Sequence, residues 1–195
     1  CQRPSQTGIP QVPFGNAACH RLDPFFNSHS WRRYDFAYKK DRVPFEKMES
    51  LDRWALGKCL KMVREVSGHY DQFEFHAVYR KAYEFCSVDL SNFYFDVLKD
   101  RLYTAKKNGL KRRSAQTALF YILRNLVKIL APVLSFTTDE VWQSLVVEEG
   151  VASVHKAEWP GEYLELIDEV AIRDWEDFLA LRDPIMSELE RKREA

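Results

Sequence analysis

The chain has 195 residues, of which 46% are hydrophobic and 14% are aromatic, and this length supports one main domain rather than two full-sized ones. The composition excludes a disordered chain, and no apolar run reaches the roughly 18 residues of a membrane span, so we expect a soluble protein with no membrane partner. The 29 basic and 29 acidic side chains balance, and over the whole chain this balance argues against a nucleic-acid partner.

The N-terminal part of the sequence differs in character from the rest. Five prolines and two glycines interrupt residues 1–45, which predicts an irregular segment. Beyond it, apolar residues from Leu51 to Val66 recur at spacings of three and four, which is typical of one buried helix face. This pattern predicts a first helix that ends near Gly68.

Two further helices are predicted before residue 105. Apolar residues from Phe75 to Phe85 repeat the same spacing, which predicts a second helix of about four turns that stops before Asp89. Ser91 is a candidate N-cap for a third helix, whose apolar residues continue to Leu102 over a wide and therefore buried surface.

The strongest helical pattern follows a short basic loop. Ser114 is a candidate N-cap, and apolar residues from Ala115 to Leu130 hold an i, i+3, i+4, i+7 rhythm. Since so much of its circumference is apolar, we expect this helix at the centre of the core, and Pro132 should end or kink it.

The C-terminal part predicts two more helices. Thr137 and Glu140 have the spacing of a capping box, which would open a short helix. The apolar residues from Val170 to Leu179 predict a last helix that is interrupted near Pro184.

These elements predict an all-α protein, an antiparallel helical bundle with no internal repeat. We expect three parts: an irregular N-terminal segment and linker at 1–45, the bundle at 46–147, and an acidic segment with a truncated last helix at 148–195.

Charge is distributed unevenly along the chain. Residues 1–137 hold 23 basic and 13 acidic side chains, a net charge of +10, and residues 138–195 hold 6 and 16, a net charge of −10. One short stretch holds seven cations and only one acid, Asp100; the cations are Lys99, Arg101, Lys106, Lys107, Lys111, Arg112 and Arg113. Such a patch attracts phosphate, which makes RNA a natural candidate ligand, but it also fits a solvated loop or pairing with the acidic C-terminal part.

The string DLSNFYFDVLKDRLY at Asp89–Tyr103 is more specific than any of these patterns. It resembles isoleucyl-tRNA synthetases, class I aminoacyl-tRNA synthetases in which LSNFY followed by KDRLY is typical. The resemblance runs from about Tyr34 to about Leu189, roughly four fifths of the chain. Five further segments agree with this family in the same order: LDRWAL at 51–56, FEFHAVYRKAYEFC at 73–86, RRSAQTALFYIL at 112–123, LAPVLSFTTDEVW at 130–142 and SVHKAEWP at 153–160.

The resemblance implies the helical anticodon-binding domain of such an enzyme. Its partners would be isoleucine tRNA and the catalytic domain of the same enzyme, and the complete cytoplasmic enzyme would attach isoleucine to this tRNA using ATP. The family's two ATP-handling signatures, His-x-Gly-His and Lys-Met-Ser-Lys-Ser, occur nowhere in the 195 residues. We therefore expect no cofactor and no catalytic residue in this chain, with ATP bound by a catalytic domain outside it.

Two parts of the chain depart from the family pattern. Residues 1–31 are rich in proline where a regular helix is expected, which suggests a partial gene or a disturbed reading frame. Pro184 puts the continuity of the final helix in doubt. The chain also opens with Cys1 and carries no secretory signal, so we expect it to begin within a longer protein.

The resemblance divides the seven cations into two groups. Lys99 and Arg101 lie in the most specific string and would brace the catalytic domain and the inner side of the tRNA, with Asp100 orienting Arg101 through an ion pair. The others suit phosphate contacts that hold an RNA backbone without reading its sequence: Lys106, Lys107, Lys111, Arg112 and Arg113.

Other chemistry-bearing residues give weaker signals. Four aromatic residues could stack on unpaired bases, although their helical spacing favours core packing: Phe93, Tyr94, Phe95 and Tyr103. Three scattered histidines and four cysteines show no spacing of a metal site or nucleophilic triad, and this cysteine usage favours a reducing compartment: His69, His76, His155, Cys1, Cys19, Cys59 and Cys86.

A second hypothesis remains open at this point. The chain could be a stand-alone, non-catalytic helical module that binds protein or RNA, using exposed apolar faces or its acidic C-terminal part. Salt-sensitive association with tRNA would favour the anticodon-binding domain of a synthetase, and a lack of RNA binding would favour the stand-alone module.

Overall fold

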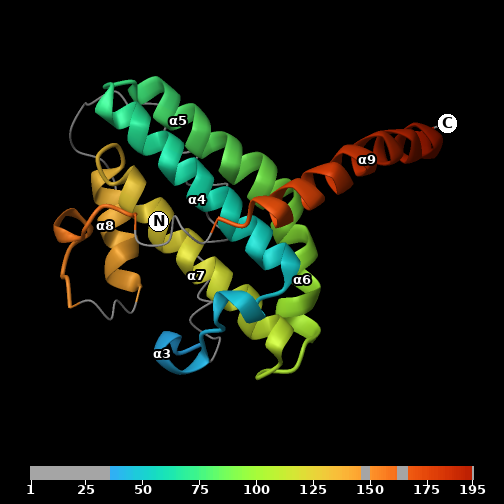
Figure 1. Ribbon diagram of the computed structural model, residues 1–195, viewed down its shortest axis with the longest axis horizontal. Coiled ribbons are helices and arrows are strands. Elements are labelled where there is room, and N and C mark those ends of the chain that lie inside the picture. The colour runs from blue at the N-terminus through green and yellow to red at the C-terminus, as the bar shows by residue number, and fades with distance from the viewer. Residues whose placement is uncertain (1–35, 146–149, 162–166, 195) are drawn as a thin grey trace, which may run out of the picture. The chain divides into compact units, whose positions relative to one another are not determined.

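The computed structural model describes residues 36–145, 150–161 and 167–194, which belong to one compact unit at 35–195. Residues 1–35 of the predicted irregular segment, which include the departure at residues 1–31, lie outside the described residues, whereas residues 36–45 are described and contain the short helix α3 (Tyr38–Asp41). Every regular element in the described part is helical, which confirms the all-α prediction (Figure 1). The elements are α3 (Tyr38–Asp41), η1 (Phe45–Lys47), α4 (Ser50–Asp71), α5 (Phe75–Glu84), η2 (Phe85–Tyr94), α6 (Phe95–Thr104), α7 (Leu110–Leu130), α8 (Ser135–Ser144), η3 (Val154–Lys156) and α9 (Glu169–Glu194).

Helix α4 lies at the centre of the bundle and contacts α5, η2, α7 and α9. Two ion pairs show that the chain reverses direction after α4. Glu65 of α4 pairs with Lys81 of α5 at 2.7 Å, and Lys58, earlier in α4, pairs with Asp89 of η2 at 3.6 Å. A later residue of α4 thus pairs with an earlier residue of the α5–η2 stretch, and an earlier residue of α4 pairs with a later one. Helix α4 and the α5–η2 stretch are therefore antiparallel, as Figure 1 shows.

Helix α7 runs parallel to α4 after a second reversal. The backbone N–H of Glu49 donates to Ser114 Oγ at 2.9 Å where both helices begin, and Tyr70 Oη donates to the carbonyl of Ile129 at 2.8 Å where both end. The two hydrogen bonds fix the register of the central pair of helices. They also give the bundle two distinct ends, one formed by the starts of α4 and α7 and the other by their ends.

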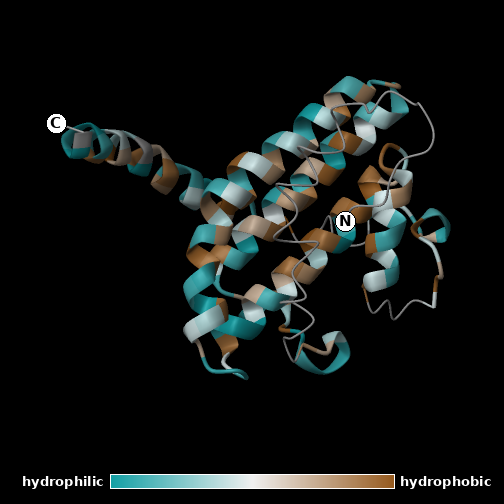
Figure 2. Cartoon of the chain, turned by 180° about the vertical axis from the view of Figure 1, so that it is seen from behind, coloured by the Kyte–Doolittle hydropathy of each residue, from teal (hydrophilic) through white to brown (hydrophobic). Residues whose placement is uncertain are grey.

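The core forms around the fully buried Trp54 of α4. Its ring meets Phe93 of η2 edge to face at 5.3 Å between centroids, and Trp175 of α9 lies 6.4 Å away. Apolar residues line the faces that α4 and α7 turn inward (Figure 2). The aromatic contacts hold the first part of α9 against the bundle, together with Lys58, which bonds Glu176 at 3.1 Å.

One carboxylate is buried where α4 begins. Asp52 is fully buried and accepts hydrogen bonds from Tyr94 Oη at 2.8 Å and from Ser114 Oγ, while Arg101 Nη1 lies 3.4 Å from its Oδ1. The predicted N-cap role of Ser114 is wrong, because α7 begins four residues earlier with Gly109 as its N-cap. The hydroxyl of Ser114 instead joins α7 to Asp52 and to the backbone of Glu49.

The second and third predicted helices form one uninterrupted helical stretch. The prediction that the second helix stops before Asp89 is wrong, and so is the N-cap role of Ser91. Residues 85–94 continue as a π-helix, in which Ser91 Oγ donates to the carbonyl of Cys86, five residues back, at 2.8 Å. The wider, i→i+5 hydrogen-bonded turns of a π-helix continue the backbone hydrogen bonding between α5 and α6, so no helix begins here and no N-cap is required.

The predicted capping box at Thr137–Glu140 is wrong as well. Helix α8 begins at Ser135, so both residues lie inside it, and no side chain caps its start. Asp139 instead accepts hydrogen bonds from Ser153 Oγ at 2.7 Å and from the Val154 N–H at 3.0 Å. These bonds tie α8 to η3 and lower the pKa of the Asp139 carboxyl.

Helix α9 continues through Pro184, so the predicted interruption is wrong. Proline removes one backbone donor, and the affected carbonyl belongs to Ala180, an exposed residue that water can reach. Among the residues that the structure describes, no helix is long and apolar enough to cross a membrane.

Replacing Asp52 with alanine removes the acceptor that three side chains share. We expect Asp52→Ala to lower the free energy of unfolding by about 3 kcal/mol, since Arg101, Tyr94 and Ser114 lose a buried partner. Urea denaturation followed by circular dichroism measures this change. A loss below about 1 kcal/mol would contradict the central role of the carboxylate.

The Asp52 carboxyl also predicts a pH dependence of stability. Burial raises its pKa above the usual 3.8, and the hydrogen bonds from Ser114 and Tyr94 and the charge of Arg101 only partly oppose this. Because the folded state holds the proton more tightly, this contribution to stability is complete below the unfolded pKa and is lost as the pH rises through the folded pKa. The free energy of unfolding of the wild type, relative to Asp52→Asn, should therefore fall as the pH rises from the unfolded pKa of the Asp52 carboxyl through its higher folded pKa. A difference that is independent of pH would exclude this titration.

Candidate nucleic-acid interface

The loop between α6 and α7 carries the first exposed cations of the predicted patch. Lys106 and Lys107 are exposed at the start of a tight turn, in which the Gly109 N–H donates to the Lys106 carbonyl at 2.8 Å. A Cβ atom at position 109 would lie 3.1 Å from that carbonyl oxygen, so glycine lets the chain close this turn. The turn leads directly into α7 and holds the two lysines at the end of the bundle.

The first turn of α7 extends this positive surface. It contains Lys111, which is exposed, and no acidic residue, and no side chain caps its start. The positive end of a helix dipole disfavours cations and attracts anions. Lys111 therefore weakens the start of α7 slightly and strengthens its attraction for phosphate.

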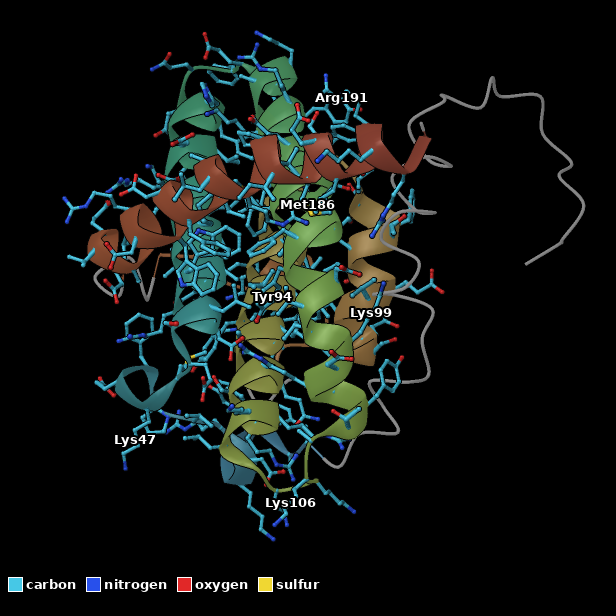
Figure 3. All side chains as sticks on the ribbon, turned by 90° about the vertical axis from the view of Figure 1, so that its right-hand side faces the viewer. Lys47, Tyr94, Lys99, Lys106, Met186 and Arg191 are labelled. Atoms are coloured by element: carbon cyan, nitrogen blue, oxygen red, sulfur yellow. The ribbon has the colours of Figure 1, made fainter. Side chains whose placement is uncertain are left out.

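The structure also brings lysines from the N-terminal segment to this end. Lys39 and Lys40 of α3 and Lys47 of η1 are exposed, and α3 and α7 are in contact. Figure 3 shows Lys47 and Lys106 at the same end of the bundle. We call this surface the basic end, and its members are Lys39, Lys40, Lys47, Lys106, Lys107 and Lys111.

Sequence reasoning missed Lys39, Lys40 and Lys47. Helix α3 is held on α7 by the hydroxyl pair of Tyr38 and Tyr121 at 2.7 Å and by the stacked rings of Tyr38 and Phe120, 4.5 Å apart. These partners lie about 80 residues away in sequence. The only local sign of these basic-end lysines was the run of cations that follows Tyr38. This run lies in the segment 1–45, which was predicted to be irregular.

Arg113 lies inside the molecule rather than on the basic end. Its side chain is nine-tenths buried, and its guanidinium donates to Gln116 Oε1 at 3.0 Å and to Asn108 Oδ1 at 2.8 Å, with Asp41 Oδ1 at 3.5 Å. These three partners come from α7, from the loop between α6 and α7, and from α3. Arg113 therefore holds the basic end together from within.

The remaining predicted cations have partners of different kinds. Arg101 turns inward to Asp52, so the expectation that Asp100 orients it is wrong. Arg112 is half-buried and reaches the Ala105 carbonyl at 3.5 Å. Lys99 is 68% exposed on α6 and pairs with Asp96 at 3.0 Å, which is a weak surface pair. Lys99 thus stays accessible, although a neighbouring acid reduces its charge.

The four aromatic residues that were predicted to stack on bases or pack in the core also differ in exposure. Phe93 and Tyr94 are buried in the core, and Phe95 is half-buried. Tyr103 is 71% exposed near the end of α6, close in sequence to Lys106. Only this ring, among the four, is available to stack on a ligand beside the basic end.

The comparison with known families agrees with this arrangement. Residues 52–195 match the family model described as the anticodon-binding domain of tRNA ligase. The chain belongs to this family. The match includes α4, α7, the loop between α6 and α7, and α9.

Curated relatives support the same family. The chain is 41% identical over 160 residues to the isoleucine-tRNA ligase of Fervidobacterium nodosum and 41% identical over 160 residues to that of Natranaerobius thermophilus. It is 43% identical over 161 residues to that of Moorella thermoacetica. Each match covers 82% of this chain and 17% of the relative. The chain thus spans about one sixth of the length of these relatives.

The described part of this anticodon-binding domain offers no metal site or activated thiol. No three His, Cys, Asp or Glu side chains of the described residues gather where they could hold a metal ion. Burial raises the pKa of Cys86 to about 12 and raises that of Cys59 further above its usual value. Burial therefore keeps both thiols protonated at neutral pH, which disfavours the reactive thiolate form.

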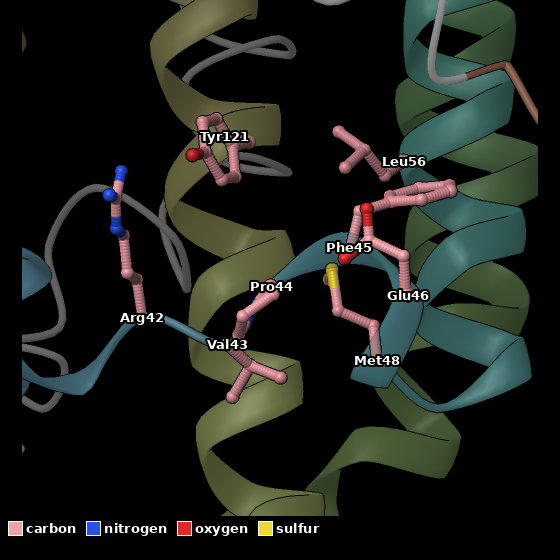
Figure 4. Close-up of a pocket in the computed structure, with 8 residues that line it drawn as sticks. All are labelled: Arg42, Val43, Pro44, Phe45, Glu46, Met48, Leu56 and Tyr121. Carbon is pink, nitrogen blue, oxygen red and sulfur yellow. The ribbon is translucent and has the colours of Figure 1, made fainter.

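A small apolar pocket lies beside the basic end, between η1 and helices α4 and α7 (Figure 4). Its volume is about 270 Å³, and its lining residues are Arg42, Val43, Pro44, Phe45, Glu46, Met48, Leu56 and Tyr121. This volume is smaller than that of most cofactor sites, and the walls are mainly apolar. The cations outside it therefore form the better candidate interface.

The different positions of Arg113 and Lys111 predict opposite effects on stability. Arg113→Ala should lower the free energy of unfolding by about 2 to 3 kcal/mol, because it leaves Asp41, Gln116 and Asn108 without their shared partner. Lys111→Ala, the matched control on the same helical turn, should change it by less than about 0.5 kcal/mol. Urea denaturation distinguishes the two variants, and equal effects would contradict the internal role of Arg113.

Proposed function

We propose that this anticodon-binding domain binds tRNA, with the basic end contacting the phosphate backbone. The observation that carries this proposal is the gathering of exposed lysines from α3, η1, the α6–α7 loop and the first turn of α7 on one end of the bundle. Lysine ammonium groups bind backbone phosphates as point charges, and the release of counterions supplies the free energy.

Internal ion pairs strengthen this argument. Asp52 and Asp41 are close to Arg101 and Arg113 respectively, so these four charges neutralise one another beneath the surface. The exposed lysines add positive charge at the surface of the basic end. A net charge of zero over the whole chain is then compatible with a nucleic-acid partner.

The proposal extends to isoleucine tRNA, because the similar relatives are named isoleucine-tRNA ligases. Since the chain spans about 17% of their length, the attachment of isoleucine and the binding of ATP would belong to other parts of a longer protein. This domain would hold the tRNA and pack against the catalytic domain, without a cofactor of its own. Its compartment would be the cytoplasm, where tRNA is charged.

A second candidate function is a protein-interaction module. One observation favours it: Phe178, Leu181 and Ile185 of α9 are each at least half exposed and recur at spacings of three and four. Such a row can pack against another protein or against further parts of a longer chain. If the chain fails to associate with tRNA even at low salt, this second function is the better one.

Reversing the charge of three lysines tests the proposed function. The variant Lys106→Glu, Lys107→Glu, Lys111→Glu should bind isoleucine tRNA at least about 10-fold more weakly at moderate salt. The slope of log affinity against log salt should become shallower by about 2 to 3, because three phosphate contacts are lost. Fluorescence titration of labelled tRNA over a range of salt concentrations measures both quantities.

The matched control reverses three exposed cations on α9. Arg173→Glu, Lys192→Glu, Arg193→Glu changes the net charge equally but leaves the basic end intact. Its salt slope should stay close to that of the wild type. If both triple variants lose the same affinity, the effect comes from overall charge and the basic end is not the interface.

A further inference from the structure

The loop between α6 and α7 contains a chemically reactive pair of residues. Asn108 is the only asparagine of the sequence that is followed by glycine. Asparagine is thermolabile, because the backbone nitrogen of the next residue can attack its side-chain amide carbon and release ammonia. A side chain on the next residue hinders this approach, and Gly109 has none. The sequence therefore marks the Asn108–Gly109 pair as a candidate site for loss of the amide.

The structure leaves this pair accessible. Asn108 is exposed and lies outside both helices, since α6 ends at Thr104 and α7 begins at Leu110. The attacking nitrogen takes part in the turn, where the Gly109 N–H donates to the Lys106 carbonyl at 2.8 Å. This hydrogen bond has to open before the nitrogen can attack. Exposed loops open locally at a much lower free energy than core helices, so the turn slows the reaction without preventing it.

Arg113 contacts the amide that would react. Its Nη2 donates to Asn108 Oδ1 at 2.8 Å. A positively charged donor stabilises the negative charge that develops on a carbonyl oxygen when its carbon is attacked. The same oxygen remains in an aspartate product, to which a guanidinium group bonds more strongly than to an amide. Arg113 therefore favours the reaction at Asn108, and the fold can keep this contact once an aspartate has formed.

We propose that Asn108 is a site of spontaneous deamidation, which places a negative charge in the basic end. In the first step the Gly109 nitrogen loses its proton to water and bonds to Asn108 Cγ, while the Cγ–Nδ2 bond breaks and Nδ2 leaves as ammonia. Water then adds to either carbonyl carbon of the resulting succinimide ring. Breaking the bond from Cγ to the Gly109 nitrogen gives aspartate, and breaking the bond from the main-chain carbon gives isoaspartate. The net change converts one amide and one water into one carboxylate and one ammonium ion.

The new charge lies among the lysines that would contact RNA. Lys106 and Lys107 directly precede Asn108, and Lys111 lies three residues after it. A carboxylate at this position repels phosphate and attracts the lysine ammonium groups, so the affinity for an RNA backbone falls. Because water is the only co-reactant, the change accumulates as the protein ages. This loss of affinity rests on the proposed function, whereas the deamidation itself does not.

Mass spectrometry tests the chemistry. After prolonged incubation at mildly alkaline pH, chymotrypsin should release the segment 104–110 with its amide converted to a carboxyl group, partly as isoaspartate that isoaspartyl methyltransferase labels. The rate should rise with pH, because the Gly109 nitrogen has to lose its proton. Asn92 is the internal control, since it is also exposed but precedes Phe93 within η2. Retention of the amide at Asn108, or equal rates at Asn108 and Asn92, would overturn the proposal.

The variant Asn108→Asp reproduces one product and measures its effect on RNA binding. It should bind isoleucine tRNA about 5-fold more weakly than the wild type at low salt. Its urea midpoint should not fall, because Arg113 keeps an acceptor at this position. The weaker affinity can then be attributed to charge rather than to unfolding.

The matched control is Asn108→Gln, because its longer side chain closes an imide ring far more slowly. The wild type should lose affinity for tRNA on incubation, whereas incubated and fresh Asn108→Gln should bind equally. If Asn108 deamidates but Asn108→Asp binds as tightly as the wild type, the effect on RNA is overturned while the proposed function stands. If no form of the chain binds tRNA at low salt, the effect on RNA and the proposed function are both overturned, while the deamidation stands or falls by the mass measurement.

Discussion

The hydrogen bonds and the ion pair of the buried Asp52 carboxylate are the interactions on which the arrangement of the helices depends. It is a buried charge, and such a group is tolerated only when donors surround it. Here the donors come from η2, α6 and α7, while Asp52 itself belongs to α4. One side chain therefore fixes where four elements meet. The loop between α6 and α7 leaves the bundle close to this point, so the same network holds both sides of the segment that carries Lys106 and Lys107.

The two ends of the bundle differ because its charges are sorted by depth. Arginines that are paired with Asp52 and Asp41 lie beneath the surface, where their planar guanidinium groups can satisfy several acceptors. The lysines of the basic end, each with one compact and strongly hydrated charge, remain exposed. The end formed by the starts of α4 and α7 is therefore cationic, while the opposite end exposes the rings of Phe73 and Phe75.

Sequence periodicity predicted the helical class, the central position of α7 and the buried face of α4, since these depend on local spacing alone. The placements of Ser91 and Ser114 were wrong, because a hydroxyl before an apolar run resembles a cap unless its actual partner is known. For Ser114 that partner is Asp52, 62 residues away in the sequence. Similarly, the cluster of seven cations was visible in the sequence, but the inward orientation of Arg101 and Arg113 depends on distant acids. Phe73, in the turn between α4 and α5, has a positive φ angle of 59°, which could not be predicted because no glycine marks this turn.

The π-helix η2 has a further consequence for how this chain can change in evolution. An α-helix can absorb one inserted residue by widening a turn, and residues 85–94 already consist of such wide turns within the stretch 75–104. A codon gained or lost within this segment can be taken up by widening or tightening a turn, rather than by rotating α6 about its axis. The segment can therefore adjust the helical phase between α5 and α6 while the packing of α6 against α7 is kept.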